Sequence, residues 1–284
     1  MPDSNRKTLK EFGRGIIGGL LFSLPIVYTM EVWWTGFIAP PEYLLIYIFA
    51  TYLLLLGYNR YAGMKEDSSF SEICWESVEE IGLAFIVSFL FLLLINRIDF
   101  GMSLDEIAGK VIVESMIVAI GISVGTAQLG GDDESNDHSE KSEMNVTDKD
   151  EGKKDNFFIK RIILAVCGSV LIASSVAPTD EVMMIALSCS EIQLLLMVLV
   201  SLLITGITVY FSDFQGVSKS NKSTMTVLWE IIVDYIIALV VSFAFLWFFG
   251  RIQDHGLYIL IAQVVVLGIP GTIGASAGRL LIAR

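Results

Sequence analysis

Two stretches of the sequence place acidic side chains at helical spacing inside otherwise apolar segments. Each follows the order acid, acid, small residue, hydroxyl at intervals of four, and the members are Glu76, Glu80, Ala84 and Ser88 in the first stretch and Glu230, Asp234, Ala238 and Ser242 in the second. An interval of four residues stacks side chains along one face of a helix. Clustered carboxylates bind hard cations such as Ca²⁺, Mg²⁺ or Mn²⁺ through oxygen, and crowded carboxylates become candidate proton carriers. We therefore predict a cation or proton pathway built from Glu76, Glu80, Glu230 and Asp234, which would share one axis if the two faces pack together.

A structural alternative exists for these acids. Acidic residues in the first turn of a helix are stabilised by its positive N-terminal end. This reading suits Glu76 and Glu230, whereas Glu80 and Asp234 lie one turn deeper. Inside a membrane span an ionisable residue costs about 2.5–3.5 kcal/mol on insertion scales, so it normally faces the protein interior.

A second acidic group is expected near the opposite membrane face. Glu31 follows Pro25 by six residues, and Asp180 and Glu181 come directly after Pro178-Thr179. Proline tends to break a helix, and broken helices beside acids recur at the cation sites of transporters. The alternative is that these are interfacial acids next to a loop proline. We predict that Glu31, Asp180 and Glu181 line the outer part of the same pathway.

One further acid lies inside an apolar run. Glu114 follows Lys110 by four residues, a spacing at which opposite charges can pair on one helix face. Its counterpart in the second half of the chain is Leu267. We predict a structural ion pair between Glu114 and Lys110.

No enzymatic site is predicted. The G-x-S-x-G pattern occurs at 121–125 and 274–278, but both copies lie in apolar runs and the two histidines, His138 and His255, lie outside such runs. A nucleophile elbow needs a strand–turn–helix context and a base within reach, whereas the same glycines fit the G-x-x-x-G pattern of close helix packing. The three cysteines form no Cys-x-x-Cys or Cys/His cluster. No cofactor is expected beyond a bound cation, and the acids do not decide among Ca²⁺, Mg²⁺, Mn²⁺, Na⁺, K⁺ and a proton.

The elements that must position these acids are membrane spans. The chain has 284 residues, of which 54% are hydrophobic and 18% charged, and its mean hydropathy is +0.66. About 20 apolar residues in a helix cross the hydrocarbon core of a bilayer. The apolar runs lie near 15–37, 42–62, 75–96, 104–129, 160–178, 191–212, 227–250 and 258–282. The first is too long for the core of a signal peptide, so we expect it to be retained.

The connections between these runs differ in positive charge. Lysines and arginines gather at both ends of the chain, in the central linker and in the connections on the same side, whereas the opposite connections carry little beyond Arg97 and Arg251. By the positive-inside rule both termini and the linker are cytoplasmic. We predict a multi-pass protein of a plasma (inner) membrane.

The acid-bearing stretches belong to a longer internal repeat. Residues 75–98 align without a gap on residues 229–252, and 10 of the 24 positions are identical, among them a shared Trp-Glu start and a shared Arg-Ile end. We predict an all-α polytopic membrane protein with eight transmembrane helices, arranged as two parallel four-helix repeats related by an axis along the membrane normal. Transporters often place their pathway at such a repeat interface.

The predicted units are residues 1–129 and 158–284, the two membrane repeats, joined by an acidic linker at 130–157. The linker has almost no large apolar residue, so we expect it to be a disordered cytoplasmic tether. Lipid is the expected partner, and nucleic acid is not, because the chain has no patch of Lys/Arg to neutralise phosphates. The leading function is a membrane cation pathway, either an ion channel or a proton-coupled cation transporter. The alternative is a membrane scaffold or sensor that recruits a partner through the linker, and a homo-oligomer is left open.

The chain also resembles a known group of proteins. The features that carry the resemblance are Glu31-x-Trp33-Trp34 leading into Pro40-Pro41, and Ala177-Pro-Thr-Asp-Glu181 in the second half. They resemble a family of uncharacterised bacterial integral membrane proteins of unknown function. The resemblance implies a bacterial plasma membrane and assigns no site residue.

Overall fold

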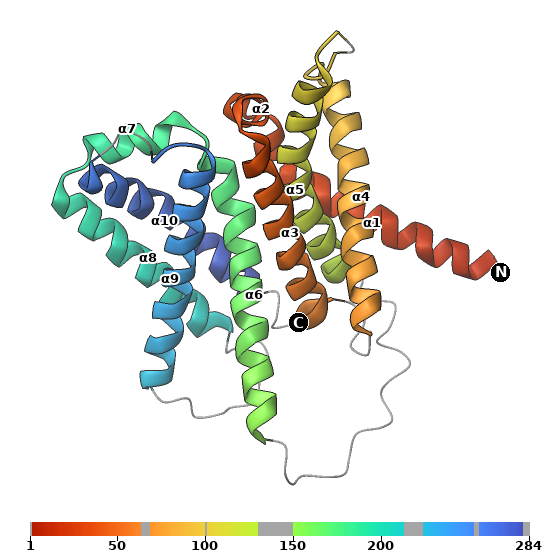
Figure 1. Ribbon diagram of the computed structural model, residues 1–284. Coiled ribbons are helices and arrows are strands. Elements are labelled where there is room, and N and C mark those ends of the chain that lie inside the picture. The colour runs from red at the N-terminus through yellow and green to blue at the C-terminus, as the bar shows by residue number, and fades with distance from the viewer. Residues whose placement is uncertain are drawn as a thin grey trace.

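The computed structural model describes residues 2–63, 69–99, 101–129, 150–212, 224–252 and 256–280, and the regular structure in these ranges is helical (Figure 1). In chain order the helices are α1 (Pro2–Val27), α2 (Met30–Ile38), α3 (Pro41–Ala62), α4 (Phe70–Leu94), α5 (Leu104–Leu129), α6 (Asp150–Val176), α7 (Asp180–Ser188), α8 (Glu191–Ser212), α9 (Thr224–Phe248) and α10 (Leu257–Leu280). This confirms the expected all-helical polytopic class.

Seven of these helices are long and apolar enough to cross a bilayer, namely α3, α4, α5, α6, α8, α9 and α10. Each covers one of the predicted spans from 42–62 onward. The pair α1 and α2 passes the same test jointly, which would bring the count to eight, but the two helices are bent by 88° at their junction. The expected first span at 15–37 is therefore not one straight helix.

The bend has a local cause. Pro25, close to the end of α1, has no backbone N–H to extend the helical ladder. The hydroxyl of Thr29 donates a hydrogen bond to the Pro25 carbonyl at 2.7 Å and satisfies a helix-end acceptor. Glu31 consequently lies in the first turn of the short helix α2, beyond the bend.

The second half has a similar junction, where the long helix α6 is followed by a short one. The hydroxyl of Thr179 donates to the carbonyl of Val176, the last residue of α6, at 2.8 Å. The short helix α7 starts at Asp180 and has nine residues, as α2 does. Asp180 and Glu181 occupy its first turn.

Other parts of the two halves also correspond. α3 and α8 have 22 residues each, and α4 and α9 have 25 each. Both α4 and α9 end at a residue with positive φ, Asn96 at 57° and Gly250 at 69°. The next backbone N–H, of Arg97 or Arg251, then donates to a carbonyl of the last turn at 2.8 Å in both cases. Left-handed residues of this kind are the usual end of a helix.

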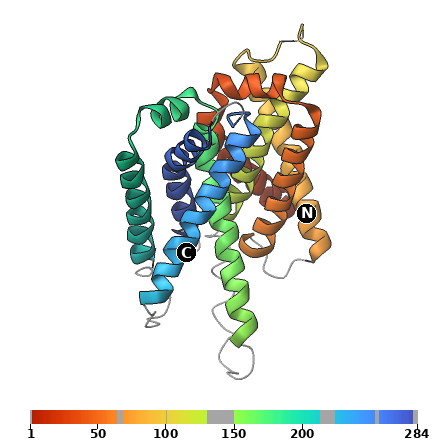
Figure 2. The ribbon, with the colours of Figure 1, turned by 60° about the vertical axis from the view of Figure 1, so that its left-hand side comes forward.

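One helix lies at the centre of each half. α5 packs against α1, α2, α3 and α4, and α10 packs against α6, α7, α8 and α9 (Figure 2). Glycine allows the closest of these contacts: a Cβ on Gly18 would lie 2.5 Å from the Cα of Gly125, and a Cβ on Gly168 would collide with the carbonyl of Gly274. The interpretation of the 121–125 and 274–278 glycines as packing residues is confirmed. The halves join where α6 packs against α3, with smaller contacts to α1 and α5.

The linker is shorter than expected. α6 begins at Asp150, so the prediction of disorder is wrong for residues 150–157. Starting a helix is costly and extending one is not, so the apolar part of α6 can carry the helix into polar sequence. A cytoplasmic partner was expected to bind the linker at 130–157, and residues 130–149 of it lie outside the described part of the chain.

Candidate functional site

Glu80 lies in a network of hydrogen bonds between three helices. It projects from α4, is 9% exposed, and accepts a hydrogen bond from the Asn59 amide of α3 at 2.8 Å. The same amide nitrogen donates to the Ser77 hydroxyl at 3.1 Å, and the Asn59 carbonyl oxygen accepts from the Ser123 hydroxyl of α5 at 2.7 Å. These partners are neutral, and within the described ranges no cationic side chain forms an ion pair with Glu80. Neutral donors stabilise a carboxylate without cancelling its charge.

A cavity of about 130 Å³ adjoins Glu80. The residues that line it come from α1, α4 and α5, and they are Phe12, Gly15, Glu76, Glu79, Glu80, Leu83, Ile122 and Thr126. Roughly 10–15 Å³ of such volume holds one water molecule, so the cavity has room for several. Three of its carboxylates lie near the N-terminal end of α4, and Glu80 is the deepest of them.

In the second half a cation contacts the outer acid of the repeated face. Glu230, the counterpart of Glu76, forms an ion pair with Arg161 of α6 at 2.7 Å, and both side chains are over 90% buried. Asp234, the counterpart of Glu80, is 1% exposed on the same face of α9. A buried carboxylate with a guanidinium partner is neutralised as a pair. The structure thus shows an amide partner for Glu80 and a guanidinium partner for Glu230.

The two acidic faces do not pack together. α4 packs against α1, α3 and α5, whereas α9 packs against α6, α8 and α10, and α3, α5 and α6 lie between them (Figure 1). Among the described residues no three Asp, Glu, His or Cys side chains form a group that could hold a metal ion. The expectation that Glu76, Glu80, Glu230 and Asp234 share one axis is thus not met in this structure. Each acidic face lies within its own half, because α4 packs against the central helix α5 and α9 packs against the central helix α10.

The outer acids take up separate positions. Asp180 is exposed and pairs with Arg251 at 2.5 Å, and Arg251 also donates to the Pro178 carbonyl. In the first half the matching arginine, Arg97, lies over the ring of Trp33 at 4.3 Å. The arginine at the end of α4 or α9 therefore contacts the short helix of its own half, or the residues just before it. Glu31 is partly exposed and Glu181 is exposed.

The predicted ion pair between Lys110 and Glu114 is wrong. The Lys110 ammonium pairs with Glu106 at 2.6 Å and donates to the Arg97 carbonyl at 3.3 Å. These partners lie one turn before Lys110 or at the end of α4, where a lysine side chain can reach the membrane boundary. Glu114 stays 0% exposed in the middle of α5, and its carboxylate accepts no hydrogen bond from the residues that the structure describes.

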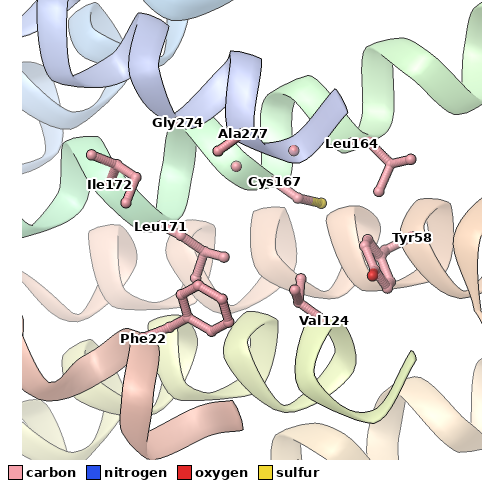
Figure 3. A pocket seen from close by; sticks show the side chains of 11 residues that line it. Phe22, Tyr58, Val124, Leu164, Cys167, Leu171, Ile172, Gly274 and Ala277 are labelled. Atoms are coloured by element: carbon pink, nitrogen blue, oxygen red, sulfur yellow. The ribbon is translucent and has the colours of Figure 1, made fainter. Parts of the chain in front are cut away.

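The contact between the halves contains a small apolar cavity rather than a carboxylate site. It measures about 50 Å³ and is lined by α1, α3, α5, α6 and α10. Phe22, Leu171 and Val124 point into it, and Tyr58 and Cys167 lie at its edge (Figure 3). No acid lines this cavity, although Glu80 lies within electrostatic range of Cys167 at its edge.

Comparison with known proteins agrees with this architecture. A family model with the description "Putative integral membrane protein (DUF2391)" matches residues 11–282. The chain belongs to this family. No curated protein and no solved structure matched the chain. The family resemblance inferred from the sequence is confirmed, and the match spans both halves of this member of the family, including the segment between them.

Sequence reasoning missed the partners that decide the chemistry in this family member. Asn59 is the amide that holds Glu80, and Arg161 is the cation that neutralises Glu230. Asn59 carries a readable signal, since it is an amide inside an apolar run, and such residues usually form hydrogen bonds between helices. Arg161 was interpreted only as a positive charge at the cytoplasmic boundary.

Proposed function

We propose that the protein is a membrane cation pathway, a channel or a proton-coupled transporter, in which Glu80 accepts the ion. The proposal includes a duplicated unit: each half is a broken first span followed by three straight spans, so that eight spans form two parallel repeats. Equal helix lengths, matching breaks and matching helix ends support this arrangement. The positive-charge bias places the termini and the linker in the cytoplasm of a bacterial cell.

One observation carries the proposal. Glu80 is a buried carboxylate in an apolar span, held by neutral donors, and it lies against a cavity that Glu76 and Glu79 also line. A purely structural acid inside a membrane span would be expected to pair with a cation, as Glu230 does with Arg161. Intramembrane acids that lack such a pair typically mark ion paths and proton relays.

The two halves are expected to differ in how easily a cation enters them. The carboxylates near the start of α4 form a negative approach to Glu80, which attracts cations and repels anions. In the second half Arg161 supplies positive charge at the corresponding level of α9 and opposes cation access. The path therefore runs through the first half, between α1, α4 and α5, and the second half serves as its packing partner.

Flux into proteoliposomes tests this assignment. Purified protein is reconstituted with a fluorescent pH indicator or cation indicator inside, and an ion gradient or membrane potential is imposed. We expect Glu80→Gln to abolish flux and the repeat-equivalent Asp234→Asn to retain it, with helicity and elution volume as folding controls. Equal flux in wild type and Glu80→Gln would remove the central residue of the proposal. A wild type without flux that captures a protein through residues 130–157 would favour the scaffold alternative.

A further inference from the structure

Glu114 is the most isolated acid of the membrane interior. Both of its carboxylate oxygens are buried and lack a hydrogen-bond donor among the described residues. An unpaired carboxylate in such surroundings would cost many kcal/mol if ionised, and groups in this position avoid the cost by becoming neutral. The acid therefore needs a ligand that cancels its charge.

The surroundings of Glu114 admit few ligands. From α2, the indole of Trp33 lies close to the carboxylate, but its N–H donates to the Val27 carbonyl at 2.9 Å. From α3, the Tyr47 hydroxyl lies within electrostatic range, and this hydroxyl is itself buried and without a partner among the described residues. On α5 itself, Lys110 points toward Glu106. No cationic side chain of α1, α4 or α6 in the described ranges forms an ion pair with Glu114.

A metal ion does not suit this site. Hard cations require about six to eight oxygen ligands, often several of them carboxylates, and Mg²⁺ keeps a near-octahedral shell. Glu114 and Tyr47 supply one carboxylate and one hydroxyl. The described residues also contain no group of three potential metal ligands. A proton needs a single acceptor and removes the charge completely.

The fold does not need an acid at this position. The counterpart of Glu114 in α10 is Leu267, which is equally buried and packs in the core of the second half. The outer side of Glu114 is closed by Trp33, which is 8% exposed and lies beneath the Arg97 guanidinium. An acid that packing does not require, enclosed and without a counter-charge, has the features of a proton-binding group.

We propose that Glu114 is a proton-binding site in the membrane interior, which holds a neutral carboxylic acid beside the Tyr47 hydroxyl. A carboxylic acid carries no charge that has to be compensated, so its burial beside the unpartnered Tyr47 hydroxyl costs less than that of a carboxylate. Its participation in transport rests on the proposed function and identifies the transported ion as a proton. The occupancy of the site by a proton is independent of transport.

Infrared spectroscopy of the reconstituted protein tests the site. A protonated carboxyl group has a C=O stretching band that is separate from those of carboxylates and amides. We expect this band in wild type at neutral pH, its loss in Glu114→Gln, and its retention in Glu106→Gln, the matched control whose carboxylate is paired with Lys110. A shifted band in Glu114→Asp is the second measurement if the glutamine variant does not fold. Retention of the full band in Glu114→Gln, or no change in Glu114→Asp, overturns the proposal.

Proton flux separates this inference from the proposed function. If flux depends on Glu80 but the spectrum holds no band assigned to Glu114, the site fails and the pathway stands. If the band is present and assigned but wild type carries no flux, the site stands and the pathway fails. We expect the band in wild type, and the loss of both the band and proton flux in Glu114→Gln.

Discussion

Replacing Asn59 by leucine removes the side chain that ties α3 to α4 and α5. Asn59 takes part in three hydrogen bonds, with Ser77, Glu80 and Ser123, and is 6% exposed. Leucine is similar in size, so the change removes these bonds with little change of volume. Glu80 would then lose its Asn59 donor while remaining buried.

The magnitude follows from the partners. Side-chain hydrogen bonds between membrane helices average about 0.6 kcal/mol and reach about 1.7 kcal/mol in double-mutant cycles. Two neutral bonds at the mean and a charge-assisted bond to Glu80 near the upper value give a loss of about 3 kcal/mol in the free energy of unfolding. The pairwise coupling between Asn59 and Glu80 should be about 1–2 kcal/mol on the same scale.

The assay is a double-mutant cycle in detergent or bicelles. Unfolding of wild type, Asn59→Leu, Glu80→Leu and the double variant is followed by circular dichroism as denaturant is added. Independent sites are additive within about 0.3–0.5 kcal/mol. A coupling energy inside that range would show that Asn59 does not hold Glu80, and the organisation of the proposed site would lose its basis.

Three further outcomes are expected from other contacts. Arg161→Gln removes the guanidinium that pairs with buried Glu230 and should lower the free energy of unfolding by about 3–5 kcal/mol. Adding Glu230→Gln should restore stability, and no recovery in denaturant unfolding would contradict the pairing. Gly168→Ala should cost about 1–3 kcal/mol because its Cβ meets the backbone of α10. Gly13→Ala, with open space around it inside α1, should instead stabilise by about 0.5–1 kcal/mol through helix propensity. Equal effects of the two changes would argue against the close packing. Arg251→Leu should increase amide hydrogen exchange in α7. The free energy of unfolding should fall by at most about 1 kcal/mol, because the acidic partner Asp180 is exposed. Unchanged exchange would show that the contact does not hold this helix.

Most of the helical architecture could be predicted from hydropathy. Lipid cannot hydrogen-bond the backbone, so each long apolar run has to satisfy its own backbone groups as a helix. Seven straight spans lie over the predicted runs for this reason. The bend after Pro25 and the extension of α6 to Asp150 were not predicted, because both depend on how a helix end is stabilised rather than on hydrophobicity.

The candidate site could be predicted only in part. Spacing by four residues identified Glu80 and Asp234 as interior acids, and both are buried. The partner of each acid lies on another helix, and a pattern along one helix contains no information about it. Lys110 illustrates the limit. It lies four residues from both Glu114 and Glu106, so spacing allows either ion pair, and the structure forms the pair with Glu106.

The sequence by itself determined the membrane class, the positions of seven spans and the duplicated acid, acid, small, hydroxyl face. These follow from composition and periodicity along the chain, which lipid and helix geometry translate directly into structure. Only the tertiary structure decided that α3, α5 and α6 separate the two acidic faces and that Asn59 binds Glu80 while Arg161 binds Glu230. It also decided that Glu114 is enclosed without a hydrogen-bond partner among the described residues. The physical reason is that the charge state and the chemistry of a buried acid depend on the side chains that neighbouring helices bring to it, and helix packing selects those neighbours.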